Sequence, residues 1–219
     1  MNERAIEIMI ESFSQILLPG IYVTIPLTLI SFIIGLVIAL MTAMVQVANI
    51  RFLKQFARFY IWIIRGTPLL VQLFIVFYGL PNLGITLEAF PSAVIVFSIN
   101  TGAYASEIIR AAIESIPKGQ LEAGYCAGMT YWQTMRRIII PQALKTAFPP
   151  LSNTLIGLLK DTSLAANITI MEMFMSAQRI AARTYEPFLL YCEVALIYLL
   201  FCTVLTKIQR VCEFKLERK

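Results

Sequence analysis

The residues of this chain that could carry chemistry point to binding and docking rather than to catalysis. Histidine is absent from all 219 residues, which removes the usual imidazole base, the Ser-His-Asp triad and the H-E-x-x-H metal site. The four cysteines lack C-x-x-C spacing, so neither a disulfide framework nor a zinc site is indicated. No G-x-x-x-x-G-K-[ST] loop is present to hold a nucleotide phosphate. Polar residues instead gather in the segment 118–150 and around Lys160–Asp161.

The composition places these polar residues in an integral membrane protein. The chain is 58% hydrophobic and 14% charged, whereas soluble domains are about 45–50% apolar and 25% charged. The basic residues behind the net charge of +5 are scattered among apolar runs and do not form one basic face. Nucleic acid is therefore not an expected partner, and we expect the chain to be surrounded by lipid. We expect one all-α membrane domain over residues 1–219.

Five apolar segments are long enough to cross a bilayer, for which about 20 residues suffice. The segments predict five transmembrane helices at residues 18–46, 59–80, 89–113, 146–168 and 187–208. An amphipathic lead-in precedes the first, and Arg51, Lys54 and Arg58 form a short basic loop before the second. Gly66, Thr67 and Pro68 should break the second helix near its entrance and leave Arg65 at the interface.

The polar loop 115–145 predicts two short helices. Gly128 should end the first, and Thr130 with Gln133 three residues later is typical of a capping box that begins the second. Pro141 should limit the second helix, because proline lacks a backbone donor.

Seven residues of this loop stand at the spacing of the cytoplasmic EAA loop of ABC importer permeases: Glu122, Ala123, Gly124, Gly128, Ile138, Ile140 and Pro141. The chain departs from the family pattern at Gly124, the third residue of E-A-A, and at Ile140, where the pattern has leucine. RGTPLLVQLF from Arg65, the stretch around Asn100–Tyr104 and LLKDTSLAANI from Leu158 resemble the polar amino-acid branch of that family. The resemblance covers residues 16–212 and is strongest to cystine importer permeases.

The resemblance implies the permease subunit of an ATP-driven importer in the bacterial cytoplasmic membrane, carrying a polar amino acid such as cystine. It also implies a second permease subunit, an extracytoplasmic amino-acid-binding protein, and two ATPase subunits that bind ATP and Mg, while this chain binds no cofactor. The contact with the ATPase would use Glu122, Ala123, Gly124, Gly128, Arg136, Arg137 and Pro141. For Glu122 the alternative is an ordinary solvated helix position. The alternative function is a self-sufficient secondary transporter or channel, which often shows an inverted repeat that is not visible here.

Polar residues inside two predicted spans are candidates for a substrate pathway. The uncharged run 146–159 reaches full length only if the helix includes Lys160 and Asp161, and charge at membrane depth costs at least ~2.5–3.5 kcal/mol per residue. A zwitterionic amino acid would offer its carboxylate to the lysine and its ammonium to the aspartate. Hydrogen bonds would come from Asn100, Thr101, Tyr104, Thr162 and Ser163. Alternatively, the lysine extends to the interface and the uncharged residues only join helices.

The distribution of basic residues predicts the orientation. If the loop 115–145 is cytoplasmic, most of the lysines and arginines, including the tail 207–219, lie on the cytoplasmic side, and Arg4, Arg179 and Arg183 lie outside. The N-terminus is then outside and the C-terminus is in the cytoplasm.

Overall fold

The computed structural model describes residues 3–48 and 51–218, and every regular element in these ranges is a helix. Residues 1, 2, 49, 50 and 219, the last of which ends the basic tail, lie outside the described ranges. The predicted all-α class is confirmed. The α-helices are α1 (Glu3–Pro19), α2 (Ile25–Val47), α3 (Arg51–Gly66), α4 (Leu69–Phe74), α5 (Ala89–Glu114), α6 (Lys118–Cys126), α7 (Tyr131–Thr134), α8 (Ile140–Asp161), α9 (Met173–Thr184) and α10 (Pro187–Glu217).

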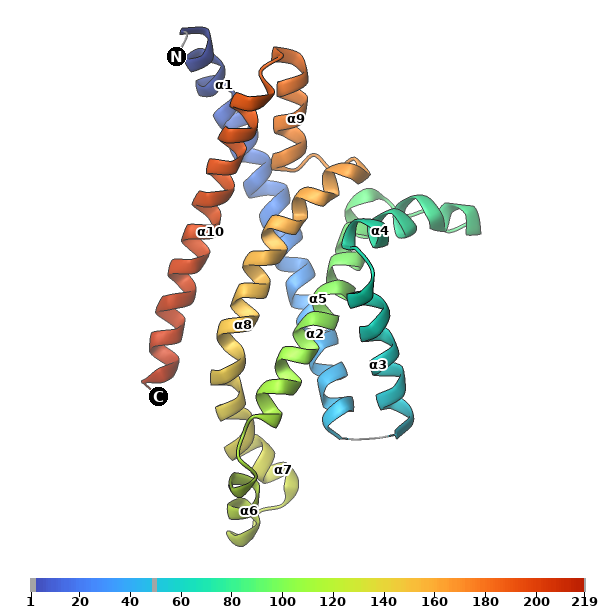
Figure 1. Cartoon of the computed structure of the whole chain (residues 1–219), viewed down its shortest axis with the longest axis vertical. Helices are drawn as coiled ribbons and strands as arrows, with labels where there is room; N and C mark the ends of the chain where they lie inside the picture. Colours follow the sequence, from blue (N-terminus) through green and yellow to red (C-terminus); the bar gives the residue numbers. More distant parts are fainter. Residues whose placement is uncertain (1–2, 49–50, 219) are drawn as a thin grey trace.

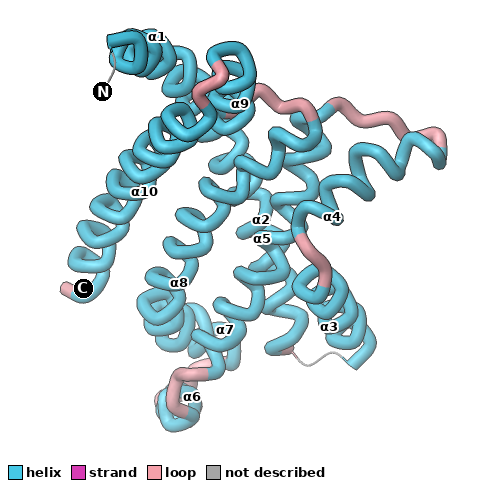
Figure 2. The backbone as a smooth tube through the Cα atoms, turned by 45° about the horizontal axis from the view of Figure 1, so that its top comes forward, coloured by secondary structure: helices cyan, strands magenta, loops and turns pink. Residues whose placement is uncertain are grey.

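Shorter helical turns join several of these helices. Turns of π-helix occupy Gly20–Thr24, Ile75–Gly79 and Met135–Ile139, and turns of 3-10 helix occupy Leu80–Leu83 and Thr162–Ile168. In Figures 1 and 2, α2, α5 and α8 run through the middle of the molecule, with α10 on one side and α3 and α4 on the other, and α9 lies at the end where α1 and α10 begin. Helices α6 and α7 form one end of the molecule, and the N-terminus lies toward the other end (Figure 1).

Helices α1 and α2 are joined by the π-turn Gly20–Thr24 into one continuous helical segment. The stretch Arg4–Val47 has 44 residues, which at 1.5 Å per residue makes about 66 Å, roughly twice the bilayer core. The helix therefore begins earlier than the predicted span 18–46, because the amphipathic lead-in is part of it. Ile16 on the apolar side of α1 is fully buried against α9 and α10. The π-turn Gly20–Thr24 comes just before Pro26, whose missing donor falls in the first turn of α2.

The most extensive helix contact is between α2 and α5, and it depends on small side chains. Ala39 and Ala43 of α2 pack with Ala105 of α5 in one buried cluster. A methyl group added to Gly35 would lie 2.9 Å from Thr101. Close approach of helix backbones through small residues is the usual way in which membrane helices associate.

Helices α3 and α4 form an elbow. Their axes differ by 103° at the break Thr67–Pro68, close to where the G-T-P sequence predicted it. Residues 51–58, predicted to be a loop, are instead the start of α3. The basic residues there alternate with Phe52, Phe56 and Phe59, which are exposed, so the segment is an amphipathic helix rather than a connector.

Pro141 does not end the second loop helix, which corrects the prediction from sequence. Helix α7 continues through the π-turn Met135–Ile139 into α8. The N–H of Ile140 donates to the carbonyl of Met135, five residues back. The backbone hydrogen bonds have therefore already shifted from the α-helical to the π-helical pattern just before Pro141. Helix α8 thus starts six residues before the predicted span 146–168, and the 3-10 turn after it reaches Ile168.

Length and composition identify three helices within the described ranges that can cross a membrane: Arg4–Val47, Ala89–Glu114 and Pro187–Leu216. Helices α3 and α4 make a fourth if the bent pair counts as one span. Helix α8 does not qualify, and prolines and polar residues such as Gln142, Lys145 and Asn153 lower its hydropathy. The number of five spans stays a prediction.

Candidate functional site

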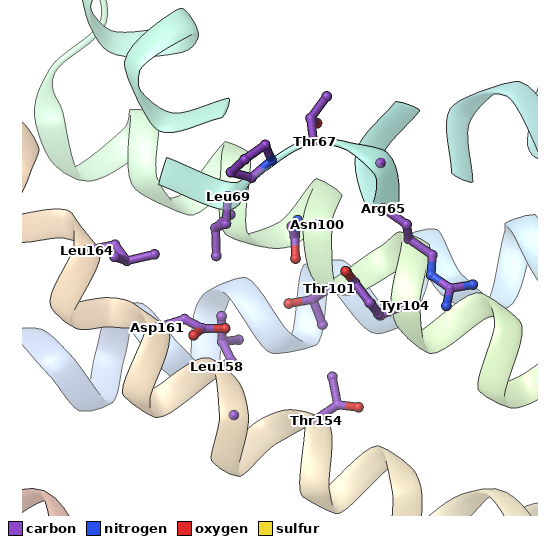
Figure 3. Close-up of a pocket in the computed structure, with 13 residues that line it drawn as sticks. Arg65, Thr67, Leu69, Asn100, Thr101, Tyr104, Thr154, Leu158, Asp161 and Leu164 are labelled. Atoms are coloured by element: carbon purple, nitrogen blue, oxygen red, sulfur yellow. The ribbon is translucent and has the colours of Figure 1, made fainter. Parts of the chain in front are cut away.

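A cleft of about 560 Å³ lies where the elbow between α3 and α4 meets the middle of α5 and the end of α8. The elbow contributes Arg65–Leu69, and α5 contributes Asn100, Thr101 and Tyr104 (Figure 3). The third wall consists of residues from Thr154 to Leu164, including Asp161. Three distant segments of the chain thus bring charged, amide and hydroxyl groups to one hollow.

Arg65 and Asp161 are the two charged side chains of this cleft, and they come from different walls. The guanidinium carbon of Arg65 lies 5.1 Å from the centre of the Tyr104 ring, a cation–π contact. Figure 3 shows Arg65 extending past Tyr104 toward the edge of the cleft, while Asp161 projects from α8 toward α5. Neither residue forms a salt bridge with another residue of the ranges 3–48 and 51–218. The cleft therefore presents one group of each sign of charge.

The residues predicted for a substrate pathway divide between two clefts. Asn100, Thr101, Tyr104 and Asp161 line the cleft just described. Lys160 and Ser163 line a separate cleft of about 600 Å³ between α8 and α10, in which Tyr191 and Tyr198 also lie. Thr162 is fully buried, and its hydroxyl donates to the Leu159 carbonyl at 2.6 Å. Neighbouring residues of a helix point about 100° apart, which separates Lys160 from Asp161.

Arg65 is the charged residue of this cleft that sequence reasoning missed. The prediction left it at the membrane interface because the helix was expected to break beside it. The break exists, but it turns the chain around the cleft and places Arg65 on the cleft wall. A charged residue directly before Gly-Thr-Pro, in a segment that is otherwise apolar, was the available signal.

The loop between α5 and α8 turns at Gly128, between α6 and the start of α7, as predicted. Gly128 has φ of +74°, a conformation that L side chains adopt at a cost. The predicted capping box is also confirmed at α7. The hydroxyl of Thr130 accepts from the Gln133 N–H at 3.4 Å, and the Gln133 side chain accepts from the Thr130 N–H at 2.9 Å.

Gly124 is buried where α6 contacts α7. A methyl group added to it would lie 2.6 Å from the hydroxyl oxygen of Thr134 and 3.0 Å from its Cβ. The same hydroxyl donates to the Thr130 carbonyl at 3.1 Å, so Thr134 cannot turn away without losing a bond. Glycine in place of alanine at this position therefore has a packing reason.

The remaining residues of the loop form an exposed surface. Glu122 and Ala123 on α6 are exposed, as are Arg136, Arg137 and Pro141 after α7. Two large aromatic side chains are exposed beside them, Tyr125 at 48% and Trp132 at 67%. Aromatic and arginine side chains are the types enriched at protein interfaces, so this surface is suited to contact with another protein.

Comparison with known proteins identifies relatives along almost the whole chain. Residues 32–218 match the family described as binding-protein-dependent transport system inner membrane component. The chain is 54% identical over 209 residues to the L-cystine transport system permease protein TcyB of Bacillus subtilis (strain 168), over 95% of this chain and 89% of that protein. It is 41% identical over 206 residues to the probable amino-acid ABC transporter permease protein YckA of the same strain, over 94% of this chain and 91% of that protein.

Solved structures agree with this assignment. The crystal structure of an amino acid ABC transporter with histidines contains a chain that matches with a TM-score of 0.88 and 35% identity, over 94% of this chain and 96% of that chain. A chain of the inward-facing MetNI methionine ABC transporter matches with a TM-score of 0.71, over 99% of both chains. Its identity is 16%, so this second match concerns the fold alone.

Proposed function

The chain belongs to the family of binding-protein-dependent transport system inner membrane components, and we propose that it is the permease subunit of an ATP-driven importer of a polar amino acid, with cystine as the first cargo to test. Its relatives include a permease named for L-cystine transport and one named for amino-acid transport. The chain is a multi-pass membrane protein and its role is translocation.

The observation that carries this proposal is the cleft at the elbow of α3 and α4. Irregular backbone at membrane depth is tolerated where it is buried in protein or lines a cavity, and interrupted helices often form transporter binding sites. Arg65 would bind the α-carboxylate of the amino acid and Asp161 its α-ammonium, with Asn100, Thr101 and Tyr104 as hydrogen-bonding neighbours. Arg65 thus replaces Lys160, which faces the other cleft, as the partner of the carboxylate.

The loop of α6 and α7 would dock on the ATPase. The exposed residues Glu122, Ala123, Arg136, Arg137 and Pro141 form the contact, while Gly124 and Gly128 set its shape. A complete importer would contain a second permease subunit, two ATPase subunits that bind ATP and Mg, and an extracytoplasmic binding protein. In this arrangement the loop is cytoplasmic, the N-terminus is outside and the C-terminus is in the cytoplasm.

The role of the cleft is tested by uptake of labelled cystine into vesicles that contain the complete importer. Asp161→Asn and Arg65→Gln each remove one charge, and the loss of a hydrogen bond to a charged group should raise the apparent KM by roughly tenfold or more. Lys160→Gln is the control, because it removes a charge from the other cleft, and its KM should stay close to that of the wild type. Unchanged kinetics in both cleft variants would exclude this cleft as the substrate site.

The rival function, a self-sufficient transporter or channel, makes a different prediction. It requires uptake by this chain alone, without ATPase subunits and without sensitivity to ATP. We expect no cystine uptake by vesicles that hold the chain alone, and uptake once ATPase subunits, binding protein and ATP are added. Equal uptake in both preparations would favour the rival.

A further inference from the structure

We propose that Gln72 is a positioning residue that fixes both the elbow and the direction in which Asn100 presents its amide to the cleft. This inference rests on the proposed role of the cleft in binding an amino acid. Gln72 is the fourth residue of α4 and is 9% exposed. Its side chain bonds at both ends, to the elbow through its amide nitrogen and to α5 through its amide oxygen.

The nitrogen end compensates for the break in α3. A regular helix would pair the carbonyl of Ile64 with the N–H of residue 68, but that residue is proline and has none. The Nε2 group of Gln72 donates to this carbonyl at 2.8 Å and also lies 3.1 Å from the Thr67 carbonyl oxygen. It further donates to the Thr67 hydroxyl at 2.9 Å, which in turn donates to the Ile63 carbonyl. One side chain thus bonds the Ile64 carbonyl, which the elbow leaves without its usual backbone partner, and the Thr67 carbonyl beside it.

The oxygen end fixes the orientation of Asn100. The Nδ2 group of Asn100 donates to Oε1 of Gln72 at 3.2 Å. With its nitrogen held in this way, Asn100 turns its oxygen toward the interior of the cleft, as Figure 3 shows. An amide oxygen accepts hydrogen bonds, whereas the nitrogen donates them, so Gln72 decides which of the two a ligand meets.

The result is a cleft with two chemically different ends. Asn100 and Asp161 offer acceptor oxygens for an ammonium group, and Arg65 offers donors for a carboxylate. Gln72 also orders the elbow that carries Arg65. It therefore couples the position of the Arg65 guanidinium to the direction in which the Asn100 side-chain oxygen points. The cleft would therefore favour an amino acid over the same molecule without its amino groups.

The experiment compares the binding of L-cystine and of 3,3′-dithiodipropionate, which is cystine without its two amino groups, to the permease purified with its ATPase subunits. Gln72→Met keeps the length of the side chain but removes both sets of bonds. It should free Asn100 to rotate and lower the preference for cystine by about tenfold, the value of one hydrogen bond to a charged group. Gln46→Met is the matched control, since Gln46 is also buried and bonded, to Glu107, but lies outside the cleft.

A purely structural role for Gln72 would lower the melting temperature of the Gln72→Met complex and leave its preference for cystine equal to that of Gln46→Met, and this outcome would overturn the proposal. Asn100→Leu provides a second test that leaves the bonds of the elbow in place. It should lower the preference as Gln72→Met does, and the two changes together should lower it no further. Wild-type preference in Asn100→Leu would also overturn the proposal. If the wild-type complex binds neither compound, the proposed function itself fails.

Discussion

Gly124 determines how closely α6 and α7, the helices of the loop between α5 and α8, approach each other. Its hydrogen atom faces the side chain of Thr134, and nothing larger fits without displacing a threonine that is already bonded to the backbone. The family pattern has alanine at this position, so in this chain the glycine and the threonine form a matched pair.

This pairing predicts that Gly124→Ala will be costly and that a second change will relieve it. Overpacking typically costs about 1–3 kcal/mol, which should separate α6 from α7 and lower ATP-driven uptake. Thr134→Ala in addition removes the hydroxyl and methyl that the new side chain would meet, and should restore most of the uptake. Stimulated ATPase activity and uptake in the same vesicles provide the measurement. A fully active Gly124→Ala permease would show that the loop adjusts freely.

At the scale of elements, α9 is anchored by one buried acid. Glu172 caps α9, and its carboxylate accepts from the N–H groups of Phe174 at 2.8 Å and Met175 at 2.6 Å. The hydroxyl of Tyr198 on α10 donates to the same carboxylate at 3.0 Å. Burial raises the pKa of Glu172, while these three bonds act in the opposite direction. The cap therefore also joins α9 to α10.

Glu172→Ala should lower the stability of the purified complex. It removes an N-cap, for which about 0.5–2 kcal/mol is usual, and it leaves a partly buried tyrosine hydroxyl without its Glu172 partner, for up to about 1 kcal/mol more. Thermal unfolding measures the change. Glu186→Ala is the control, because Glu186 precedes α10 without a side-chain capping bond, and its melting temperature should equal that of the wild type. Equal melting temperatures for the two variants would contradict the anchoring role.

The elements that the sequence predicted well have local causes. The uncharged run from Ala89 predicted α5 to within a residue, and Thr130 with Gln133 predicted the start of α7. Continuity across Pro141 could not be predicted, because it depends on a π-turn that leaves no local sequence signal. The site was predictable only as far as local sequence signals reach. Asp161 was identified as a charge within a predicted span. Its assignment to a different cleft from Lys160 depends on which helices pack against each side of α8, and this is not a local property.

At the scale of the whole molecule, the proposed orientation places the turn between α9 and α10 outside the cell and α6 inside. Tyr185 in that turn is 87% exposed, and Cys126 at the end of α6 is exposed as well. In variants that retain one cysteine each, a membrane-impermeant thiol reagent should label Tyr185→Cys on intact cells, and Cys126 only after permeabilisation. The reverse pattern would invert the topology and remove the loop from the ATPase side.

The unbroken helix from α7 through α8 has a mechanical consequence. It begins in the exposed loop at Tyr131 and ends in the cleft at Asp161, an arm of at most about 45 Å at 1.5 Å per residue. A tilt of about 5° at the loop would move the far end by about 4 Å over such a length. Hydrogen bonds weaken well before they stretch that far. If the loop docks on the ATPase and Asp161 binds the ammonium group, as proposed above, a small rotation by the ATPase would displace one wall of the site far enough to release that group without any change in charge.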